Sequence, residues 1–193
     1  AERDMPMLGL PADPAIIKRL WKMIAAFHGN IWNVETFARA MGLNSKTIKK
    51  YINFFEQAYL IHRLQPFHIN IKKRLVKSPK IYIRDTGILH SLNGIDTMDN
   101  LLNNVLIGAS WEGYIIEQVF SSLNEKTEAY FYRTHQGTEC DLLLLKNNKP
   151  FACIEIKYTS FPKITKSFST AIKDLKTTRN YIIAYTESCF SLD

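Results

Sequence analysis

Residues 139–157 read "ECDLLLLKNNKPFACIEIK" and contain two apolar runs joined by a polar turn. This pattern predicts two neighbouring β-strands. Both strands carry charged residues in their interiors, namely Asp141 in the first and Glu155 and Lys157 in the second. Because an unpaired buried charge is strongly destabilised or forced to neutralise, these three side chains either pair with one another or take part in chemistry.

The flanking segments extend this pair of strands into an α/β domain. Before it, apolar residues at helical spacing predict an amphipathic helix of about four turns, with a stripe formed by Val105, Ile107, Trp111, Ile115, Val119 and Phe120. Further strands are expected at "EAYFYRT" (128–134) and "RNYIIAYT" (179–186), with a helix at "SFSTAIKDLKT" (167–177) between the last two strands. Helix, three strands, helix and strand in this order predict a compact α/β domain with a central sheet.

Strand periodicity predicts which side chains share a face of this sheet. Alternate residues point to the same side of a strand. Asp141 is therefore expected beside Glu139, and Glu155 and Lys157 beside Cys153, whereas Cys140, Leu142 and Leu144 take the opposite face of their strand. Two adjacent strands then bring Asp141, Glu155 and Lys157 within a few ångströms of one another.

Two carboxylates on adjacent strands are suited to holding one or two Mg²⁺ or Mn²⁺ ions, with the carbonyl of Ile156 as a further oxygen ligand. Such a metal polarises a phosphodiester and lowers the pKa of an attacking water, while Lys157 orients that water or stabilises charge in the transition state. Glu112 and Glu117 on the preceding helix are candidates for a further acid; they lie about 140° apart around the helix, and Glu112 is preferred. The alternative is a half-exposed ion pair that contributes about 1 kcal/mol and catalyses nothing.

The first half of the chain is predicted to be mostly helical. "PAIIKRLWKMIAAFHG" (14–29) predicts a helix that ends at Gly29. A short helix over 34–41, a turn at 42–44 and a second helix from about 46 to 58, capped by Ser45, form a helix-turn-helix pattern. "LIHRLQPF" (60–67) and "PKIYIRD" (79–85) are then expected to pair as strands, giving a β-hairpin wing.

Two interpretations of this helix-turn-helix module stay open. In the first, the module binds DNA through the exposed face of the second helix and through the wing loop. In the second, it packs against other proteins or domains and its lysines are merely solvated. The candidate DNA contacts are Ser45, Lys46, Lys49 and Lys50 on the helix and Lys72, Lys73 and Arg74 in the loop.

Composition is that of an ordinary globular protein. The 193 residues carry a formal net charge of +7, which favours an anionic partner such as nucleic acid. No apolar run approaches membrane-spanning length and no signal peptide is apparent, so we expect a cytoplasmic protein without membrane contact. Three cysteines, each beside apolar residues, suit buried free thiols: Cys140, Cys153 and Cys189.

The predicted site residues carry a resemblance to a known family. Asp141 with Glu155-Ile156-Lys157 resembles the acidic signature of the PD-(D/E)xK nuclease superfamily, which has the restriction-endonuclease-like fold. In addition, "KSPKIYIRDTGIL", "GASWEGYIIEQV", "YFYRTHQGTECDLLL" and "ACIEIK" together resemble the uncharacterised C-terminal domain of a family of bacterial and archaeal AAA-type ATPases. In that family a helix-turn-helix or winged-helix segment precedes the nuclease-like part, in the order found here.

The resemblance implies a role for each matching residue. Asp141 and Glu155 are the implied metal ligands, Lys157 the catalytic-type lysine and Glu112 the helix acid. It further implies DNA and the ATPase domain of the same longer chain as partners, and homo-oligomerisation is left open. Many members of this superfamily keep the fold only as a binding platform, so a DNA-tethering or protein-interaction module without activity is the alternative.

No GxxxxGK[ST] stretch occurs in the sequence, so ATP hydrolysis is not expected from these residues themselves. The lack of methionine at position 1 favours a fragment of a longer protein. We therefore expect a winged-helix module over residues 1–90 and a nuclease-like domain over 91–193, with the boundary between residues 85 and 105.

Overall fold

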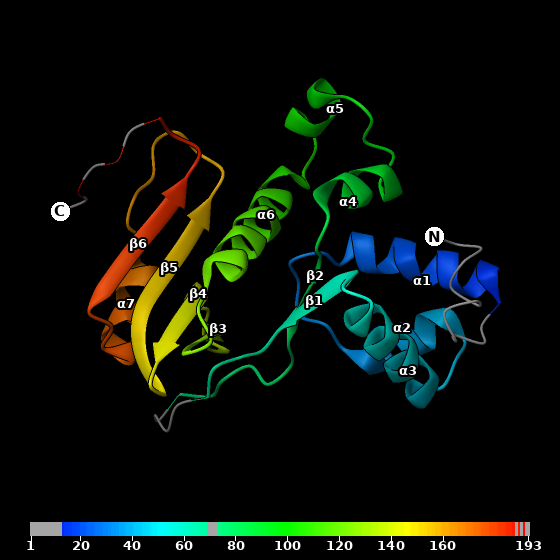
Figure 1. Cartoon of the computed structure of the whole chain (residues 1–193), viewed down its shortest axis with the longest axis horizontal. Helices are drawn as coiled ribbons and strands as arrows, with labels where there is room; N and C mark the ends of the chain where they lie inside the picture. The colour runs from blue at the N-terminus through cyan, green and yellow to red at the C-terminus, as the bar shows by residue number, and fades with distance from the viewer. Residues whose placement is uncertain (1–12, 69–72, 188, 190, 192–193) are drawn as a thin grey trace. The chain divides into compact units, whose positions relative to one another are not determined.

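The structure, a computed structural model, describes residues 13–68, 73–187, 189 and 191. Their contacts divide the chain into two compact units (Figure 1). The N-terminal unit contains residues 1–63 and 80–104, and the C-terminal unit contains residues 64–79 and 105–193. These bounds differ from the expected 1–90 and 91–193, because the segment 64–79 folds with the later part of the chain.

Three helices begin the N-terminal unit: α1 (Pro14–Ala26), α2 (Val34–Met41) and α3 (Ser45–Gln57). Each has a side-chain cap at its start, as expected for helices whose first N–H groups lack intrahelical partners. Asn44, and not Ser45 as predicted, caps α3 by accepting a hydrogen bond from the N–H of Thr47 at 2.8 Å. Gly42 ends α2 with a φ of 68°, a conformation that glycine adopts without strain.

A small sheet and two short helices complete this unit. Strands β1 (Ile61–Leu64) and β2 (Lys80–Ile83) pair as predicted. Helices α4 (Thr86–Leu92) and α5 (Met98–Leu102) follow. The buried face of α1 carries Ile17, Leu20, Trp21 and Ile24, and the ring of Trp21 stacks on Phe55 of α3 with centroids 4.8 Å apart.

The segment between β1 and β2 lies along strand β3 (Thr127–Arg133) of the C-terminal unit. Phe67 donates its N–H to the carbonyl of Phe131 at 2.7 Å, and Val76 donates to the carbonyl of Arg133 at 3.0 Å. The loop expected to be a wing is therefore not simply a hairpin tip, since its two arms bond to the edge of another sheet. Lys72 lies outside the described residues.

The C-terminal unit is an α/β domain with a mixed four-stranded sheet. Its elements are α6 (Ile107–Ser122), β3, β4 (Glu139–Lys146), β5 (Lys149–Lys157), α7 (Lys166–Leu175) and β6 (Arg179–Ala184). The strand order is β3-β4-β5-β6, with β5 and β6 parallel and the other pairs antiparallel. Asn147 and Asn148 both have positive φ, which is the requirement of a two-residue hairpin turn between β4 and β5.

Helix α7 packs on one face of this sheet through Phe168, Ala171 and Leu175, which form a core with Tyr132 and buried residues of β4 and β5. The buried residues of α6 are Ser110, Gly113 and Ile116, not the predicted apolar stripe, and Val105 from that stripe is fully exposed. Small side chains on the buried face let the helix backbone approach its neighbours closely, and hydrophobicity alone does not reveal such a face.

The three cysteines are all free thiols, and Cys140 and Cys153 are buried as predicted. Burial raises the pKa of the Cys140 thiol well above its ordinary value. Cys189 is exposed, so the prediction of a buried thiol was wrong there. No helix among the described residues is long and apolar enough to cross a membrane.

Candidate active site

A β-bulge positions Asp141. In the β3–β4 ladder Tyr130 lies opposite Leu143 and Tyr132 opposite Cys140, so two residues of β4, Asp141 and Leu142, face one residue of β3. A bulge of this kind bends the strand and redirects its side chains, and bulges are frequent beside active sites. After the bulge, each side chain of β4 lies on the opposite face of the sheet from the one that simple alternation predicts.

The faces of β4 therefore differ from the prediction. Cys140 packs toward α7 together with Leu143 and Leu145, and not with Leu142 and Leu144. The extra residue at the bulge causes this change, because every side chain after an inserted residue moves to the other face.

Asp141 contacts β5 between the other two predicted site residues. The regular pairing of β4 with β5 ends at Leu142 opposite Ile154. Just beyond this pair, the N–H of Ile156 donates to Oδ2 of Asp141 at 2.9 Å. The carboxylate thus takes a bond that a backbone carbonyl would otherwise accept, at the position where the two strands separate.

Glu155 and Lys157 form an ion pair on the face of β5 that α7 covers. Nζ of Lys157 lies 2.7 Å from Oε1 of Glu155, with side chains 27% and 14% exposed respectively. The same ammonium group donates to the carbonyl of Lys163 at 3.2 Å. Both groups keep some access to solvent, so an anionic ligand can reach the ammonium group without unfolding the site.

Thr165, which sequence reasoning missed, connects this pair to α7. Its Oγ1 lies 3.4 Å from both carboxylate oxygens of Glu155 and accepts the N–H of Phe168 at 3.1 Å as the N-cap of the helix. A threonine just ahead of a helical pattern such as that of residues 167–177 is a recognised cap signal and would have identified this residue.

Glu112 lies in α6, where its side chain is half-buried. The ring of Trp111, the preceding residue, contacts Tyr158 at the end of β5 with centroids 6.0 Å apart. The first turns of α6 are therefore close to the strand that carries Glu155 and Lys157.

The predicted metal ligands are all oxygen donors. Within the described part of the chain, no group of three or more His, Cys, Asp and Glu side chains is arranged to hold a metal. Asp141, Glu155 and the carbonyl of Ile156 offer oxygen donors only, which matches the preference of Mg²⁺ and Mn²⁺ for a few protein oxygens completed by water.

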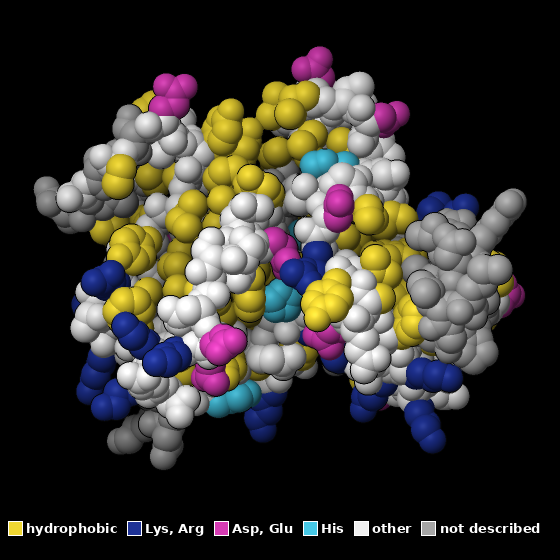
Figure 2. Space-filling model, in the orientation of Figure 1, with side chains coloured by type: hydrophobic (Ala, Val, Ile, Leu, Met, Phe, Trp, Pro, Cys, Tyr) yellow, Lys and Arg dark blue, Asp and Glu magenta, His cyan; other side chains and the backbone are white. Residues whose placement is uncertain are grey.

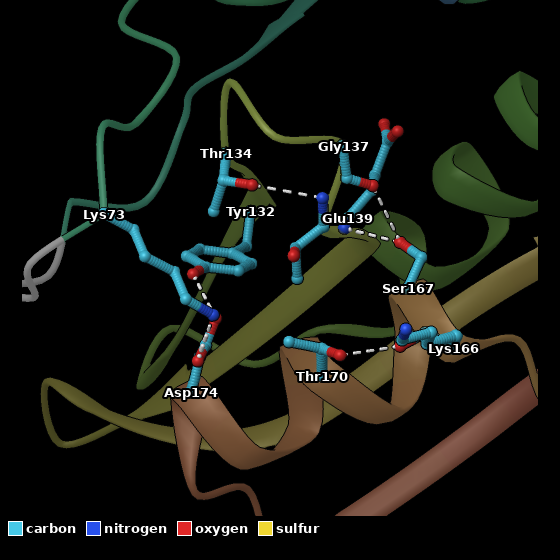
Figure 3. Close-up of polar contacts among 10 residues, drawn as sticks. Lys73, Tyr132, Thr134, Gly137, Glu139, Lys166, Ser167, Thr170 and Asp174 are labelled. Atoms are coloured by element: carbon cyan, nitrogen blue, oxygen red, sulfur yellow. Dashed lines mark hydrogen bonds and ion pairs between the residues drawn. The ribbon is translucent and has the colours of Figure 1, made fainter.

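A second polar cluster binds the segment 64–79 to α7, which is itself bonded to β3 (Figure 3). Nζ of Lys73 lies 2.7 and 2.6 Å from the two carboxylate oxygens of Asp174, and the hydroxyl of Tyr132 donates to Oδ2 of Asp174 at 2.8 Å. Burial, reinforced by the charge of Asp174, raises the pKa of Tyr132 well above its ordinary value. Lys73, predicted as a DNA contact, is therefore held in an ion pair.

Nearby, the loop before β4 is fixed to α7. The hydroxyl of Ser167 donates to the carbonyl of Gly137 at 3.0 Å and accepts the N–H of Glu139 at 2.9 Å (Figure 3). The Glu139 carboxylate lies 3.5 Å from Nη1 of Arg133. These bonds hold the start of β4, and with it the approach to Asp141, against the first turn of α7.

In the N-terminal unit the predicted contact residues of α3 lie together at its start. Lys46, Lys49 and Lys50 are exposed, whereas Ile48 and Tyr51 on the other side of the helix are buried. Ser45 donates its hydroxyl to Oε2 of Glu35 in α2 at 2.7 Å, so it joins the two helices of the turn. The three lysines present a positive surface free of core contacts. Arg74, the other predicted loop contact in the described residues, lies in the segment 64–79 and so belongs to the C-terminal unit.

Comparison with known proteins places both halves of the chain. Residues 1–99 match the family described as "Domain of unknown function (DUF8612)". The chain belongs to this DUF8612 family. Residues 107–193 match a second domain of unknown function, DUF4143. The two matches are separated by residues 100–106, and the final segment of the C-terminal unit begins within this gap, at Val105.

Relatives of this DUF8612 chain occur in bacteria and archaea. Uncharacterised proteins of Mycobacterium tuberculosis and Mycobacterium bovis are each 39% identical to it over 191 residues, which is 99% of this chain and 43% of theirs. An uncharacterised protein of Methanocaldococcus jannaschii is 25% identical over 173 residues, covering 88% of this chain and 34% of that protein. The chain thus spans less than half the length of these relatives. No solved structure matches it.

Proposed function

We propose that the C-terminal unit is a PD-(D/E)xK-like, metal-dependent phosphodiester hydrolase acting on DNA. The observation that carries this proposal is the placement of the Asp141 carboxylate on the N–H of Ile156, between Glu155 and Lys157. A bulge, a strand separation and a helix cap combine to bring these groups to one end of the sheet. A purely structural ion pair requires none of the three.

Asp141 and Glu155 would hold a Mg²⁺ or Mn²⁺ ion together with the carbonyl of Ile156. Such an ion supplies Lewis-acid polarisation of the phosphodiester and lowers the pKa of a bound water. Lys157, fixed by Glu155 and by the carbonyl of Lys163, places a positive charge where negative charge develops on the phosphoryl oxygens. Asp141 orients the backbone of β5 through its bond to Ile156.

We further propose that this chain is the C-terminal region of an AAA-type ATPase and that its N-terminal unit is a winged-helix module that binds duplex DNA. The DUF4143 family is often found in AAA-ATPase-associated proteins. The exposed lysines at the start of α3 support the DNA contact, since each lysine that reaches a phosphate releases a counterion. The catalytic unit would then act on the DNA molecule to which the N-terminal unit is bound.

A second candidate is a non-catalytic platform that tethers DNA or a protein. The pairing of Glu155 with Lys157 at 2.7 Å favours it, because this contact neutralises the carboxylate without a metal. This platform would bind DNA with a steep dependence on salt and leave the DNA intact.

The deciding experiment incubates the protein with plasmid and single-stranded DNA in Mn²⁺, with EDTA as the first control. Lys157→Ala removes the proposed charge at the site, and Lys149→Ala removes an exposed lysine at the opposite end of the same strand. Metal-dependent cleavage that is lost in Lys157→Ala and kept in Lys149→Ala supports a hydrolase. Salt-sensitive binding without cleavage favours the non-catalytic DNA-tethering role. If the protein neither binds nor cleaves DNA, the protein-interaction role is favoured.

A further inference from the structure

Four aromatic rings gather at the end of the sheet that carries Glu155 and Lys157. Trp111 of α6 contacts Tyr114, Tyr158 and Tyr185 with centroid distances of 6.0, 6.0 and 5.9 Å. Tyr158 and Tyr185 stack on each other at 5.2 Å. We refer to these four residues as the aromatic platform. Figure 2 shows hydrophobic side chains at the surface in this region, beside the ends of β5, β6 and α6 in Figure 1.

The platform is open to solvent. Tyr185 is 59% exposed and Tyr114 is 45% exposed, so each presents ring surface that no other described residue covers. Rings that serve only as core bury most of their area, as Phe131 and Tyr132 do in the same unit. The exposed rings are therefore available for a planar ligand.

The position of the platform links it to the proposed site. Tyr158 directly follows Lys157, and the two side chains emerge on opposite faces of the same strand end, toward α6 and α7 respectively. Lys157 and Lys163 supply positive charge beside this end of the strand. Aromatic rings next to cationic side chains are the combination that binds single-stranded nucleic acid, since the rings stack on bases while the cations contact the backbone.

We propose that the aromatic platform stacks unpaired bases, so that the substrate of the site is single-stranded nucleic acid. This inference rests on the proposed function, because it takes the ligand of the neighbouring site to be a nucleic acid. A base has free faces only when it is unstacked from its neighbours, which a continuous duplex does not allow. A strand that crosses the end of β5 would contact the platform with its bases and Lys157 with its phosphates.

The test measures binding in EDTA, so that no metal and no cleavage are involved. A short oligo-deoxythymidine is added while tryptophan fluorescence is followed. Trp21 and Trp32 are buried and Trp111 belongs to the platform, so quenching that disappears in Trp111→Phe reports on the platform. We expect quenching by the oligonucleotide and not by a duplex of equal length.

Three variants at two tyrosines make the test specific. Tyr185→Ala removes a platform ring, and binding should weaken about fivefold or more, as is typical for loss of one base-stacking contact. Tyr181→Ala removes a ring that is 48% exposed in β6, the strand that directly precedes Tyr185, but is not part of the platform, and it should leave binding unchanged. Tyr185→Leu keeps apolar volume, so a loss of binding there, with the folded state retained by circular dichroism, excludes unfolding as the cause.

The outcomes separate this inference from the hydrolase proposal. Absence of quenching, equal quenching by duplex, or equal weakening in Tyr181→Ala would overturn the single-strand inference, even if plasmid is cleaved. Platform-dependent binding without metal-dependent cleavage would support the single-strand inference and contradict only the hydrolase proposal.

Discussion

The carboxylate of Asp141 accepts the backbone N–H of Ile156 at 2.9 Å, at the point where β4 and β5 stop pairing. One side chain therefore has two separable roles, a structural one as hydrogen-bond acceptor and a proposed one as metal ligand. An amide retains the first role and loses the charge on which the second depends.

We expect Asp141→Asn to fold with a free energy of unfolding within about 1 kcal/mol of the parent, because the amide oxygen still accepts the bond from Ile156. Metal-dependent cleavage should fall about a hundredfold or more, since the ligand charge is lost. Asp141→Ala should instead lose about 1–3 kcal/mol of stability, because the buried N–H is left without a partner. Urea unfolding and a plasmid assay measure both, and equal stability of the two variants would contradict the structural role.

Thr165 should affect both stability and the site. Thr165→Val removes the cap of α7 and the contact with Glu155, and we expect a loss of about 0.5–2 kcal/mol in the free energy of unfolding. The Mn²⁺ concentration needed for half-maximal cleavage should rise as Glu155 loses its support. Thr165→Ser keeps the hydroxyl, so its free energy of unfolding and its Mn²⁺ requirement should stay close to those of the parent protein. A Ser variant as impaired as the Val variant would show that the hydroxyl is not responsible.

Tyr132 should make the protein sensitive to alkaline pH. Its pKa is raised in the folded state, whereas the unfolded chain titrates near the ordinary value of about 10. The unfolded state therefore binds fewer protons above that pH, and stability should fall as the pH rises past about 10. Tyr132→Phe has no phenol to ionise, so this decline should be smaller in the variant. Thermal unfolding at pH 8 and about pH 10.5 tests it, and parallel pH dependence in both proteins would refute the assignment.

Thiol reactivity should distinguish the three cysteines. Burial raises the pKa of Cys140, and Cys153 is equally inaccessible, so neither should react with Ellman's reagent in the native protein. Cys189 is exposed and should react promptly. Cys189→Ser should remove the fast phase, and all remaining thiol should appear only after denaturation. Rapid reaction of that variant would place Cys140 or Cys153 at the surface.

Salt dependence should reveal whether α3 contacts phosphates. If Lys46, Lys49 and Lys50 each bind one, then each Lys→Ala change should reduce the slope of log affinity against log salt by about 0.9 for duplex DNA. Lys126→Ala removes an exposed lysine of the C-terminal unit as a matched control. An unchanged slope in the α3 variants would favour the interpretation of this module as a protein-binding surface.

Much of the fold could be predicted because its elements follow local rules. Strand β4 begins and ends at the predicted residues, since "ECDLLLLK" is bounded by turn residues and rich in apolar side chains. The bulge at Asp141 was not predictable, because alternation assumes an unbroken ladder and the inserted residue depends on the partner strand. The buried face of α6 was also missed, since Ser110 and Gly113 pack by being small.

In the candidate site, too, some contacts could be predicted from local sequence and others could not. That Asp141 would contact the strand carrying Glu155 and Lys157 followed from the pairing of two adjacent strands, and its bond to the N–H of Ile156 lies between them. The bond from Lys73 to Asp174 did not, because those residues lie about a hundred positions apart in the sequence and no periodicity connects them. Long-range contacts of polar side chains are fixed by the packed fold, and local pattern does not contain them.

The segment 64–79 has a consequence for how this chain is inherited. It lies within the region matched by the first family, yet its backbone bonds to the sheet of the second. Recombination near residue 104 would combine a β3 strand from one ancestor with its edge partner from another. Exchange of either half alone would therefore separate residues that fold together, and we expect the two families to be transmitted as one evolutionary module.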